Sequence, residues 1–326
     1  NCTMKKFLKY FLILTLLPAV VFTSCKDDND EDPPQEVKGT FTDLKNYLVD
    51  NNMDLDDILA DWITSAEAIH GKGLDDYYIM DIRSSEDFDL GHIDGAVHSS
   101  LGTIVEDAQG VTKPIIVVCY TGQGAGHATV ALRLSGFPDA KVLKWGMSGW
   151  NEVFATSWQN NIGNPGIGHA NWTMDAVSDN QPFSYPSWES SSTDGATILA
   201  ERVAAMTEGG FKGIGGIDVL SAPSDYFINN YWPQDDVDHY GHIATAYRIL
   251  PLTIAGDEVA FLDPDGQVVT YCWTGQTSSM ITAYLTVLGY DAISLKFGAN
   301  GMIYDDLESH KWSDGAIMGY DYVTTK

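Results

Sequence analysis

The chain has 326 residues, and its 45 Asp and Glu against 18 Lys and Arg give a formal net charge of −27 at pH 7. So large a negative charge repels phosphates, and no basic cluster offsets it, so the composition excludes a nucleic-acid-binding protein. The length suggests two domains.

The first 24 residues have the pattern of a secretory signal peptide. Met4 opens a lysine-rich segment, an apolar run follows over 11–22, and small residues precede Cys25. The apolar run is too short to span a bilayer. Because the cysteine comes directly after the small residues, we expect a lipoprotein signal, with Cys25 lipidated as the first mature residue. A plain signal peptide cut near Ser24 is the alternative.

Residues 25–38 are predicted to be an acidic tether. The sequence KDDNDEDPPQE is too charged and too rich in proline to pack into a core. The expected location is therefore the cell envelope, with the lipid as the sole membrane anchor, on the periplasmic or the surface face of an outer membrane. The tether is also similar to a surface-export signal, and a plain spacer is the alternative.

Alternating strands and helices follow, over a predicted first domain (39–160) and a predicted second domain (196–326). Short β-branched runs predict buried parallel strands, and apolar residues at helical spacing predict the helices between them. The predicted strands are 77–82, 114–119, 141–145, 225–229, 267–272 and 292–297, and the main helices are 127–137, 197–206 and 279–290. Such alternation predicts an α/β fold, each domain a parallel sheet with helices on both faces.

The segment between the two domains, residues 161–195, is predicted to be an aromatic-rich linker. It is rich in Asn, Gly, Ser and Pro, yet it contains Trp172, Phe183, Tyr185 and Trp188. A flexible linker has no use for these aromatic side chains. We therefore expect the segment to pack against a domain or across the interface between domains.

The two predicted domains repeat one another. Cys119 and Cys272 both end an apolar run and both continue to T-G-Q, 153 residues apart. Gly-His-Ile precedes each cysteine, at 91–93 and 241–243, and a glycine follows each cysteine after 17 residues. The tails LKWGMSGW and LKFGANGM come next, at 143–150 and 295–302. Shared anchors in one order at near-equal spacing indicate a tandem duplication.

Each cysteine is placed where a fold of this kind can make a thiol acidic. A strand-to-helix junction lies at the carboxyl edge of a parallel sheet, where backbone N–H groups and a helix N-terminus stabilise an anion. Free cysteine has a pKa of about 8.5, and helix N-termini lower it to about 3.5–7.5. Gly122, Gly124, Gly126 and Gly275 allow a tight loop. The pattern therefore predicts an activated sulfur nucleophile, and it predicts two separate thiols instead of a Cys119–Cys272 disulfide.

These motifs resemble the rhodanese family. Asp81-x-Arg83, the Gly-His-Ile turn, the loop 119–125 and the LKWGMSGW tail look like one rhodanese domain, and the loop CWTGQTS (272–278) is similar to that of tandem sulfurtransferases. The resemblance implies two tandem rhodanese-like domains that take a sulfane sulfur from a small-molecule donor, hold it as a cysteine persulfide and pass it to a thiol or another nucleophilic acceptor. It implies no cofactor.

The resemblance also implies the site residues. Cys272 and Cys119 are the candidate nucleophiles, and Cys272 is favoured because the hydroxyls of Thr277 and Ser278 can donate to a persulfide. The predicted active-site loops are Trp273, Thr274, Gly275, Gln276, Thr277 and Ser278, and Tyr120, Thr121, Gly122, Gln123, Gly124 and Ala125. Asp81, Arg83, His92 and His242 are expected to give structural support, the first two as an ion pair.

Several positions depart from the family pattern. Gly124 and Thr277 stand where relatives often have arginine, so no loop cation awaits an anionic donor and thiosulfate is a doubtful substrate. Tyr120 and Trp273 are bulky, which favours an apolar or aromatic sulfur donor. Alternatively, the two side chains only pack within the protein. The second domain lacks the Asp-x-Arg pair, and we align Asn229-Asn230-Tyr231 with Asp81-x-Arg83.

Two other functions use a cysteine loop or a rhodanese-like fold. A cysteine phosphatase needs arginine six residues after the cysteine, and those positions are Ala125 and Ser278, which excludes it. A non-catalytic rhodanese-like binding module on the cell envelope remains the alternative, because an intact cysteine loop shows that sulfur transfer is chemically feasible but not that the protein performs it. No metal-ligand spacing occurs in the sequence. A monomer or weak oligomer is expected.

Overall fold

The computed structural model describes residues 38–325. The predicted signal peptide (1–24), the lipidation site Cys25 and all of the predicted tether except Lys38 lie outside the described residues. Val37–Lys326 forms one compact unit. Within the described range, every helix is too short or too polar to cross a bilayer.

The first half of the chain builds a five-stranded parallel sheet with the order β1-β5-β4-β2-β3. Its strands are β1 (Ile63–Thr64), β2 (Tyr78–Asp81), β3 (Val97–His98), β4 (Ile115–Val118) and β5 (Lys141–Leu143). Side chains alternate along β4: Ile115 and Val117 join the core on one face, and Ile116 and Val118 join the core on the other. Burial on both faces explains why this strand is a continuous apolar run.

The second half builds a four-stranded parallel sheet with the order β7-β11-β10-β8. The bounds are β7 (Gly213–Ile214), β8 (Phe227–Asn230), β10 (Gln267–Tyr271) and β11 (Asp291–Leu295). This order repeats β1-β5-β4-β2 of the first sheet. A third, antiparallel pair joins β6 (Trp172–Thr173) to β9 (His242–Ile243). The protein is therefore an α/β protein with parallel sheets, as the sequence predicts.

The strand register corrects one part of the sequence alignment. Asp81 pairs with Val118, directly before Cys119, and Asn230 pairs with Tyr271, directly before Cys272. Asp81 is thus equivalent to Asn230, and the segment equivalent to Asp81–Arg83 is 230–232. The alignment at 229–231 is therefore wrong by one residue.

Twelve α-helices flank the sheets in the described residues. The longer ones are α1 (Phe41–Asp50), α6 (Gln123–Leu134), α9 (Gly195–Gly209) and α12 (Gln276–Leu288). The shorter ones are α2 (Leu55–Ile58), α3 (Ala66–Lys72), α4 (Ser85–Leu90), α5 (Ile104–Asp107), α7 (Met147–Trp150), α8 (Thr156–Gln159), α10 (Gly216–Ser221) and α11 (Gln234–Tyr240).

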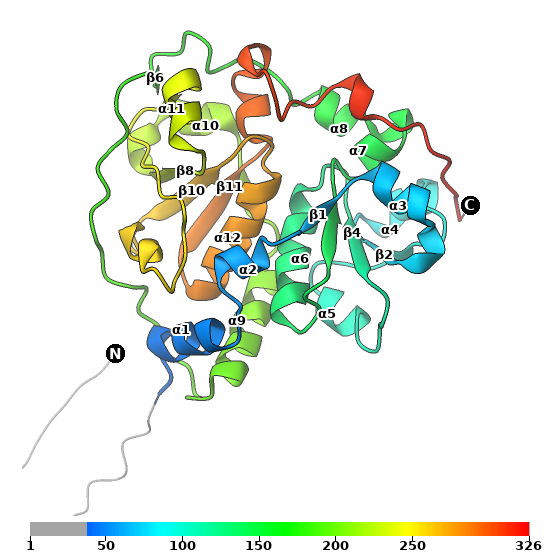
Figure 1. The fold of residues 1–326 in the computed structure, drawn as a ribbon, viewed down its shortest axis with the longest axis horizontal. Coiled ribbons are helices and arrows are strands. Elements are labelled where there is room, and N and C mark those ends of the chain that lie inside the picture. The colour runs from blue at the N-terminus through cyan, green and yellow to red at the C-terminus, as the bar shows by residue number, and fades with distance from the viewer. Residues whose placement is uncertain (1–37, 326) are drawn as a thin grey trace, which may run out of the picture. The chain divides into compact units, whose positions relative to one another are not determined.

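The helices that follow the two cysteines pack against each other. In Figure 1, α6 and α12 lie side by side between the two sheets. Gly126 of α6 lies so close to Ser279 of α12 that a Cβ at residue 126 would come within 2.1 Å of the Ser279 hydroxyl oxygen. Small residues at this contact let the helices approach closely. One core cluster therefore spans both halves, including Ala128, Val130, Ile281 and Leu285.

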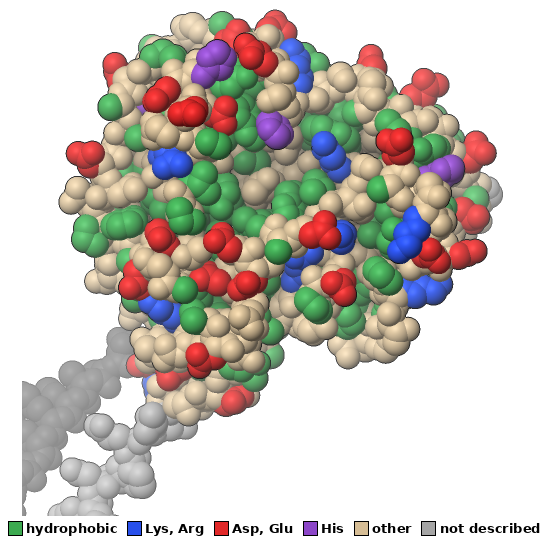
Figure 2. Space-filling model, viewed as in Figure 1, with side chains coloured by type: hydrophobic (Ala, Val, Ile, Leu, Met, Phe, Trp, Pro, Cys, Tyr) green, Lys and Arg blue, Asp and Glu red, His purple; other side chains and the backbone are tan. Residues whose placement is uncertain are grey.

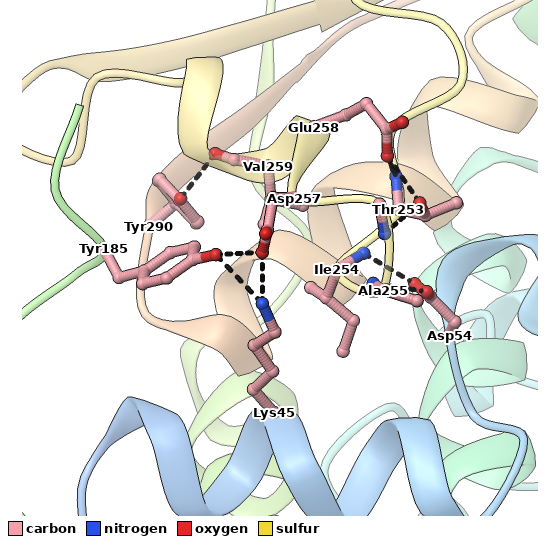
Figure 3. A network of polar contacts seen from close by, with 11 residues as sticks. Lys45, Asp54, Tyr185, Thr253, Ile254, Ala255, Asp257, Glu258, Val259 and Tyr290 are labelled. Atoms are coloured by element: carbon pink, nitrogen blue, oxygen red, sulfur yellow. Dashed lines mark hydrogen bonds and ion pairs between the residues drawn. The ribbon is translucent and has the colours of Figure 1, made fainter. Parts of the chain in front are cut away.

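The N-terminal helix of the first half packs on the second half. Helix α1 lies against α9, and the ring of Phe41 stacks on Tyr185 at a centroid distance of 4.4 Å. Figure 3 shows Lys45 of α1 bound to Asp257 and Tyr185. The same figure shows the carboxylate of Asp54 accepting hydrogen bonds from the N–H groups of Ile254 and Ala255, both at 3.0 Å.

The C-terminal segment packs on the first half. The chain leaves the core of the second half after Leu307, and the carbonyl oxygens of Asp321 and Tyr320 accept hydrogen bonds from the side chains of Trp150 and Asn151. Val323 then pairs with His92 in an antiparallel bridge. Each end of the described chain thus lies on the half that is distant in sequence, so each half is covered in part by residues of the other.

The segment 161–195 is held by the second half over much of its length. Its strand β6 pairs with β9, the indole N–H of Trp188 donates to the carbonyl of Leu288 at 3.0 Å, and Phe183 N–H donates to Ala260 at 2.7 Å. The aromatic residues of the predicted linker are therefore packed against the protein. The limits 39–160, 161–195 and 196–326 stay a prediction.

Acidic side chains are distributed across the face of the molecule that Figure 2 shows, interspersed with polar and apolar surface. Lys and Arg occur there singly or in small groups instead of forming one continuous basic surface. This distribution agrees with the strongly negative net charge.

Candidate active site

Cys119 lies between the end of β4 and the start of α6. Gly122 adopts a left-handed conformation with φ of 82°, and the helix begins at the next residue. The Sγ atom accepts hydrogen bonds from the N–H of Gly122 at 3.1 Å and of Ala125 at 3.3 Å. The first-turn N–H groups of a helix have no partner within the helix, so the thiol acts as a side-chain cap for α6.

Cys272 has the same place between β10 and α12. Gly275 has φ of 76°, and the N–H of Ser278, the third residue of the helix, donates to Sγ at 3.3 Å. The thiol lies 3.6 Å from the Ser278 hydroxyl, which in turn is 2.9 Å from the Ser294 hydroxyl. Both cysteines are free thiols.

The helices begin earlier than the sequence predicts. The apolar pattern places their starts at 127 and 279, whereas α6 begins at Gln123 and α12 at Gln276. The residues predicted to be loop after each T-G pair are thus the first turn of a helix. Polar and glycine residues in that turn hide the helical period, and the left-handed glycine before it allows the abrupt start.

Burial opposes the expected acidity of Cys119. Desolvation raises the pKa of the Cys119 thiol above its usual value, and the charge of Asp81 raises it further, whereas the N–H groups of Ala125, Thr121 and Gly122 lower it. The prediction of an acidic thiol is therefore wrong for Cys119 in the free protein. The hydrogen-bond donors are present, but the loss of solvent around a charged sulfur outweighs them.

The two thiols differ in access. Cys119 is 9% exposed and lies in a pocket of about 290 Å³, whereas Cys272 is 2% exposed. The pocket is lined by Arg83, Ser84, Asp87, Cys119, Tyr120, Thr121, Gln123, Gly124, Phe211, Lys296 and Phe297. Beside Cys272, the ring of Trp273 is stacked between those of Trp232 and His310, at centroid distances of 4.3 and 5.4 Å. The geometry therefore favours Cys119 as the accessible thiol, although the sequence favours Cys272.

The two loops are joined by their glutamines. The side-chain amide of Gln276 donates to the carbonyl of Thr121 at 2.9 Å, and the side-chain oxygen of Gln123 accepts from the N–H of Phe297 at 2.8 Å. Both glutamines are buried. The repeated T-G-Q thus has a structural reason: each glutamine leaves its own half and binds the other half beside a cysteine loop.

The repeated tails, 143–150 and 295–302, bind the backbone of the two cysteines. The N–H of Met147 donates to the carbonyl of Cys119 at 2.8 Å, and the N–H of Ala299 donates to that of Cys272 at 3.0 Å. A Cβ on Gly146 or Gly298 would come within 2.2 Å of the same carbonyl oxygens. The glycine of each L-K-aromatic-G tail is therefore required by a close approach of two backbone segments.

Asp81 and Arg83 form the expected ion pair. The guanidinium of Arg83 lies 2.6 Å from the Asp81 carboxylate, and it also donates to the carbonyl of Gly91 at 2.6 Å. Arg83 lies 4.9 Å from the ring centroid of Tyr120 and lines the Cys119 pocket. In the second half, Trp232 takes the place of Arg83 and stacks on Trp273 as Arg83 stacks on Tyr120.

The histidines of the two Gly-His-Ile turns make backbone hydrogen bonds. Nδ1 of His92 lies 2.7 Å from the carbonyl oxygen of Phe88, and the ring nitrogens of His242 lie 2.8 Å from the carbonyls of Ile243 and Asp175. His127, on the buried side of α6, packs edge-on against Phe211 at 5.0 Å. Within residues 38–325, no group of three or more His, Cys, Asp or Glu side chains is placed to hold a metal ion.

Five residues of the pocket were not among the predicted site residues, and two of them, Ser84 and Asp87, belong to the first half. Phe211, Lys296 and Phe297 come from the second half, and they complete the pocket around Cys119 of the first half. The repeated LKFG tail was the signal that could have identified Lys296 and Phe297. The sequence predicts that the loop itself offers no cation, and the structure adds that Arg83 and Lys296 reach the pocket from outside the loop.

The chain is similar to known proteins over the segment that contains Cys119. Residues 64–153 match the model of the rhodanese-like domain. The chain is 38% identical over 80 residues to the thiosulfate sulfurtransferase GlpE of Shewanella oneidensis, which covers 24% of this chain and 78% of that protein.

Two solved structures cover more of the chain at low identity. The thiosulfate sulfurtransferase of Pseudomonas aeruginosa is 15% identical with a TM-score of 0.29, covering 84% of this chain and 49% of that one. The 3-mercaptopyruvate sulfurtransferase of Leishmania major is 12% identical with a TM-score of 0.28, covering 74% and 73%.

A parallel sheet with a cysteine at the junction of strand and helix, its sulfur held by the first-turn N–H groups, defines a rhodanese-type domain. Together with the match over 64–153 and the GlpE relative, it shows that this chain belongs to the rhodanese family.

Proposed function

We propose that this protein is a sulfurtransferase built of two rhodanese-like domains in tandem, and that Cys119 carries the transferred sulfur as a persulfide. One observation carries the proposal: the Cys119 sulfur accepts two backbone N–H hydrogen bonds and lies in a pocket of about 290 Å³. The relatives named as thiosulfate sulfurtransferases support it.

The proposed chemistry follows from the geometry. The thiolate of Cys119 attacks the sulfane sulfur of a small-molecule donor, and the bond between that sulfur and the rest of the donor breaks. The N–H groups of Gly122 and Ala125, which now hold Sγ, would stabilise negative charge on the sulfur chain. A thiol or another nucleophile then takes the terminal sulfur and regenerates the thiolate.

The two loops have different parts in this proposal. The sulfur of Cys272 accepts one hydrogen bond, from the N–H of Ser278, but its thiol is nearly inaccessible and the neighbouring Trp273 is stacked between two rings. We therefore assign the transfer to Cys119 and treat the loop 272–278 as a support that holds Thr121 through Gln276. A place in the cell envelope through a lipid on Cys25 and a monomeric or weakly oligomeric state belong to the proposal as well.

A non-catalytic binding module is the second candidate. The observation in its favour is the raised pKa of the Cys119 thiol, since a neutral thiol is a weak nucleophile. Under this alternative the pocket would bind a ligand without chemistry at sulfur.

The test is to expose the protein to thiosulfate or an organic sulfane donor and to map added sulfur by mass spectrometry of peptides. We expect one added sulfur atom on Cys119, its removal by cyanide or a thiol, and loss of transfer in Cys119→Ser. The Cys272→Ser variant is the matched comparison. Sulfur only on Cys272 would overturn the assignment to Cys119, and sulfur on neither cysteine would favour the binding module.

A further inference from the structure

The pocket over Cys119 is a composite of the two halves. One wall is formed by Arg83, Asp87 and Tyr120 of the first half, and the opposite wall by Phe211, Lys296 and Phe297 of the second half. The second wall is held in place by the bond from Phe297 N–H to Gln123, which belongs to the helix that starts beside the thiol. The second half therefore decides part of what reaches Cys119.

Lys296 supplies an uncompensated positive charge to this pocket. No hydrogen bond or ion pair of its ammonium group is found within residues 38–325. Arg83 is paired with Asp81, whereas Asp87, which accepts a hydrogen bond from Ser84 at 2.6 Å, keeps a negative charge on the wall formed by the first half. An anionic group on a ligand would therefore find its free partner in Lys296.

The remainder of the lining suits an apolar body. Phe211, Phe297 and Tyr120 present aromatic surface to the same space. A cavity of about 150 Å³ can admit benzene, so a pocket of about 290 Å³ has room for an aromatic ring together with a small anionic group. Thiosulfate alone would leave the aromatic wall in contact with water.

We propose that Lys296 and Phe211 are specificity-determining residues of the Cys119 site, and that they select donors in which an anionic sulfane group is attached to an apolar body, that is, organic thiosulfonates. This inference rests on the proposed sulfurtransferase function. The lysine binds the anionic sulfonyl end of the donor and Phe211 contacts its organic group.

The step balances without any other reactant. The Cys119 thiolate attacks the sulfane sulfur of R–SO₂–S⁻, a new sulfur–sulfur bond forms, and the bond between the sulfane and sulfonyl sulfurs breaks. Its electron pair leaves with the sulfonyl group as the sulfinate R–SO₂⁻. The products are the persulfide Cys–S–S⁻ and the sulfinate, so two negative charges enter and two remain.

The charge of the pocket can be tested without sulfur transfer. Iodoacetate and iodoacetamide alkylate the same thiol, and only iodoacetate is an anion. We expect Lys296→Gln to slow the alkylation of Cys119 by iodoacetate about two- to fivefold relative to iodoacetamide, the effect of one partly exposed ion pair. Lys144→Gln is the matched control, since Lys144 holds the equivalent place in the repeated L-K-aromatic-G tail but lines another cavity. Equal effects of the two variants would overturn the role of Lys296.

The donor class is tested by kinetics. With cyanide as acceptor, we expect kcat/KM for benzenethiosulfonate to exceed that for thiosulfate by at least about tenfold, because burial of a phenyl group favours the larger donor. Phe211→Ala should remove most of this preference through KM, and Lys296→Gln should raise KM for both donors. Equal kcat/KM values for the two donors would overturn the substrate class while leaving the sulfurtransferase function intact. Transfer from neither donor would overturn the proposed function, and the alkylation result would still report on the pocket.

Discussion

Cys119 shows two opposing effects on one atom. Its hydrogen bonds from Gly122 and Ala125 favour the thiolate, and its burial favours the neutral thiol. The second effect is larger, so the pKa of the Cys119 thiol is raised. Backbone N–H donors to a sulfur atom therefore do not by themselves lower the pKa of a thiol, because the negative charge of the thiolate must also be solvated or paired.

This balance predicts the pH dependence of the reaction. Because the thiolate is the reactive form and the pKa of Cys119 lies above its ordinary value, the alkylation rate by neutral iodoacetamide should rise with pH and still be rising at about pH 9. The measurement is a pH–rate profile with the modified cysteine identified by mass spectrometry. A plateau at or below about pH 7 would contradict the raised pKa.

His127 makes a separate prediction about stability. Burial holds the pKa of His127 at about 3, below its ordinary 6.5, and the charge of Lys212 lowers it further. As the pH falls below 6.5, the unfolded chain therefore binds a proton that the folded chain does not, so the free energy of unfolding decreases. The contribution is roughly 1.4 kcal/mol per pH unit until the folded pKa is reached.

The variant His127→Leu removes this titration. Its free energy of unfolding, measured by urea at several pH values, should fall less steeply than that of the natural protein between pH 6 and 4. Met280→Leu is the matched control, since Met280 holds the equivalent position on α12 and is also buried. Parallel pH profiles for His127→Leu and the natural protein would contradict a neutral buried imidazole.

At the scale of elements, Gln123 and Gln276 connect the two halves beside the cysteine loops, one as a hydrogen-bond acceptor and the other as a donor. Gln276 must donate, because its partner is the carbonyl of Thr121, whereas Gln123 must accept, because its partner is the N–H of Phe297. Glutamate can replace an acceptor but not a donor. Each glutamine also contacts a threonine hydroxyl, since Gln123 donates to Thr121 at 3.1 Å and Gln276 accepts from Thr274 at 3.4 Å, but a hydroxyl can reverse its role. Both substitutions bury a carboxyl group, so the comparison of the two reports chiefly on the hydrogen bonds to the backbone.

We therefore expect Gln276→Glu to destabilise the protein more than Gln123→Glu, by about 1–3 kcal/mol, the cost of a buried carbonyl facing an acceptor. Urea unfolding of both variants measures this difference. It should be accompanied by faster alkylation of Cys119 in Gln276→Glu, because the loop that holds Thr121 is loosened. Equal losses of stability would contradict the assigned polarity.

At the scale of the molecule, each end of the described chain packs on the half that is distant in sequence, so the stability of each sheet depends on the other half. Helix α1 packs on α9, the C-terminal segment bridges to His92, and Trp312 joins a buried cluster with Trp145 and Trp158. The α6–α12 contact lies in a core cluster common to both halves. Neither half therefore has a complete core of its own.

The expected consequence is one cooperative unfolding transition for residues 38–325. Tryptophan fluorescence and far-UV circular dichroism should give the same urea midpoint. Trp312→Ala should lower the stability of the whole unit by about 3–5 kcal/mol, since it opens a cavity in the cluster that joins the halves. Val153→Ala, at an exposed position, is the control. Two separate transitions would show that the halves fold independently.

The sequence predicted the elements with long or regular patterns. The strands 77–82, 114–119 and 267–272 correspond to β2, β4 and β10, and the helices after the cysteines were found with late starts. Short helices such as α4, α5 and α10 were not predicted, because four to six residues carry too little of a helical period. The alignment of Asn230 was wrong by one residue, because the register is set by the pairing of β8 with β10 and is not visible in a motif.

The site was predicted in part for similar reasons. A cysteine that ends a buried strand and precedes glycine and a helix must lie at the carboxyl edge of a parallel sheet, so both cysteines and their loops could be named from the chain. Hydrogen bonds to sulfur depend on that local geometry. Phe211 could not be named, because no motif marks it and it is far from Cys119 in sequence, whereas the repeated tail offered a signal for Lys296.

By itself, then, the sequence determined the α/β architecture and the place of each cysteine between a strand and a helix, because strand burial, helix period and tight turns depend on neighbouring residues. Only the tertiary structure decided which thiol is accessible, that the pKa of Cys119 is raised, and that Lys296 and Phe211 face it. Burial and electrostatics depend on residues brought together from distant parts of the chain, and no local pattern records them.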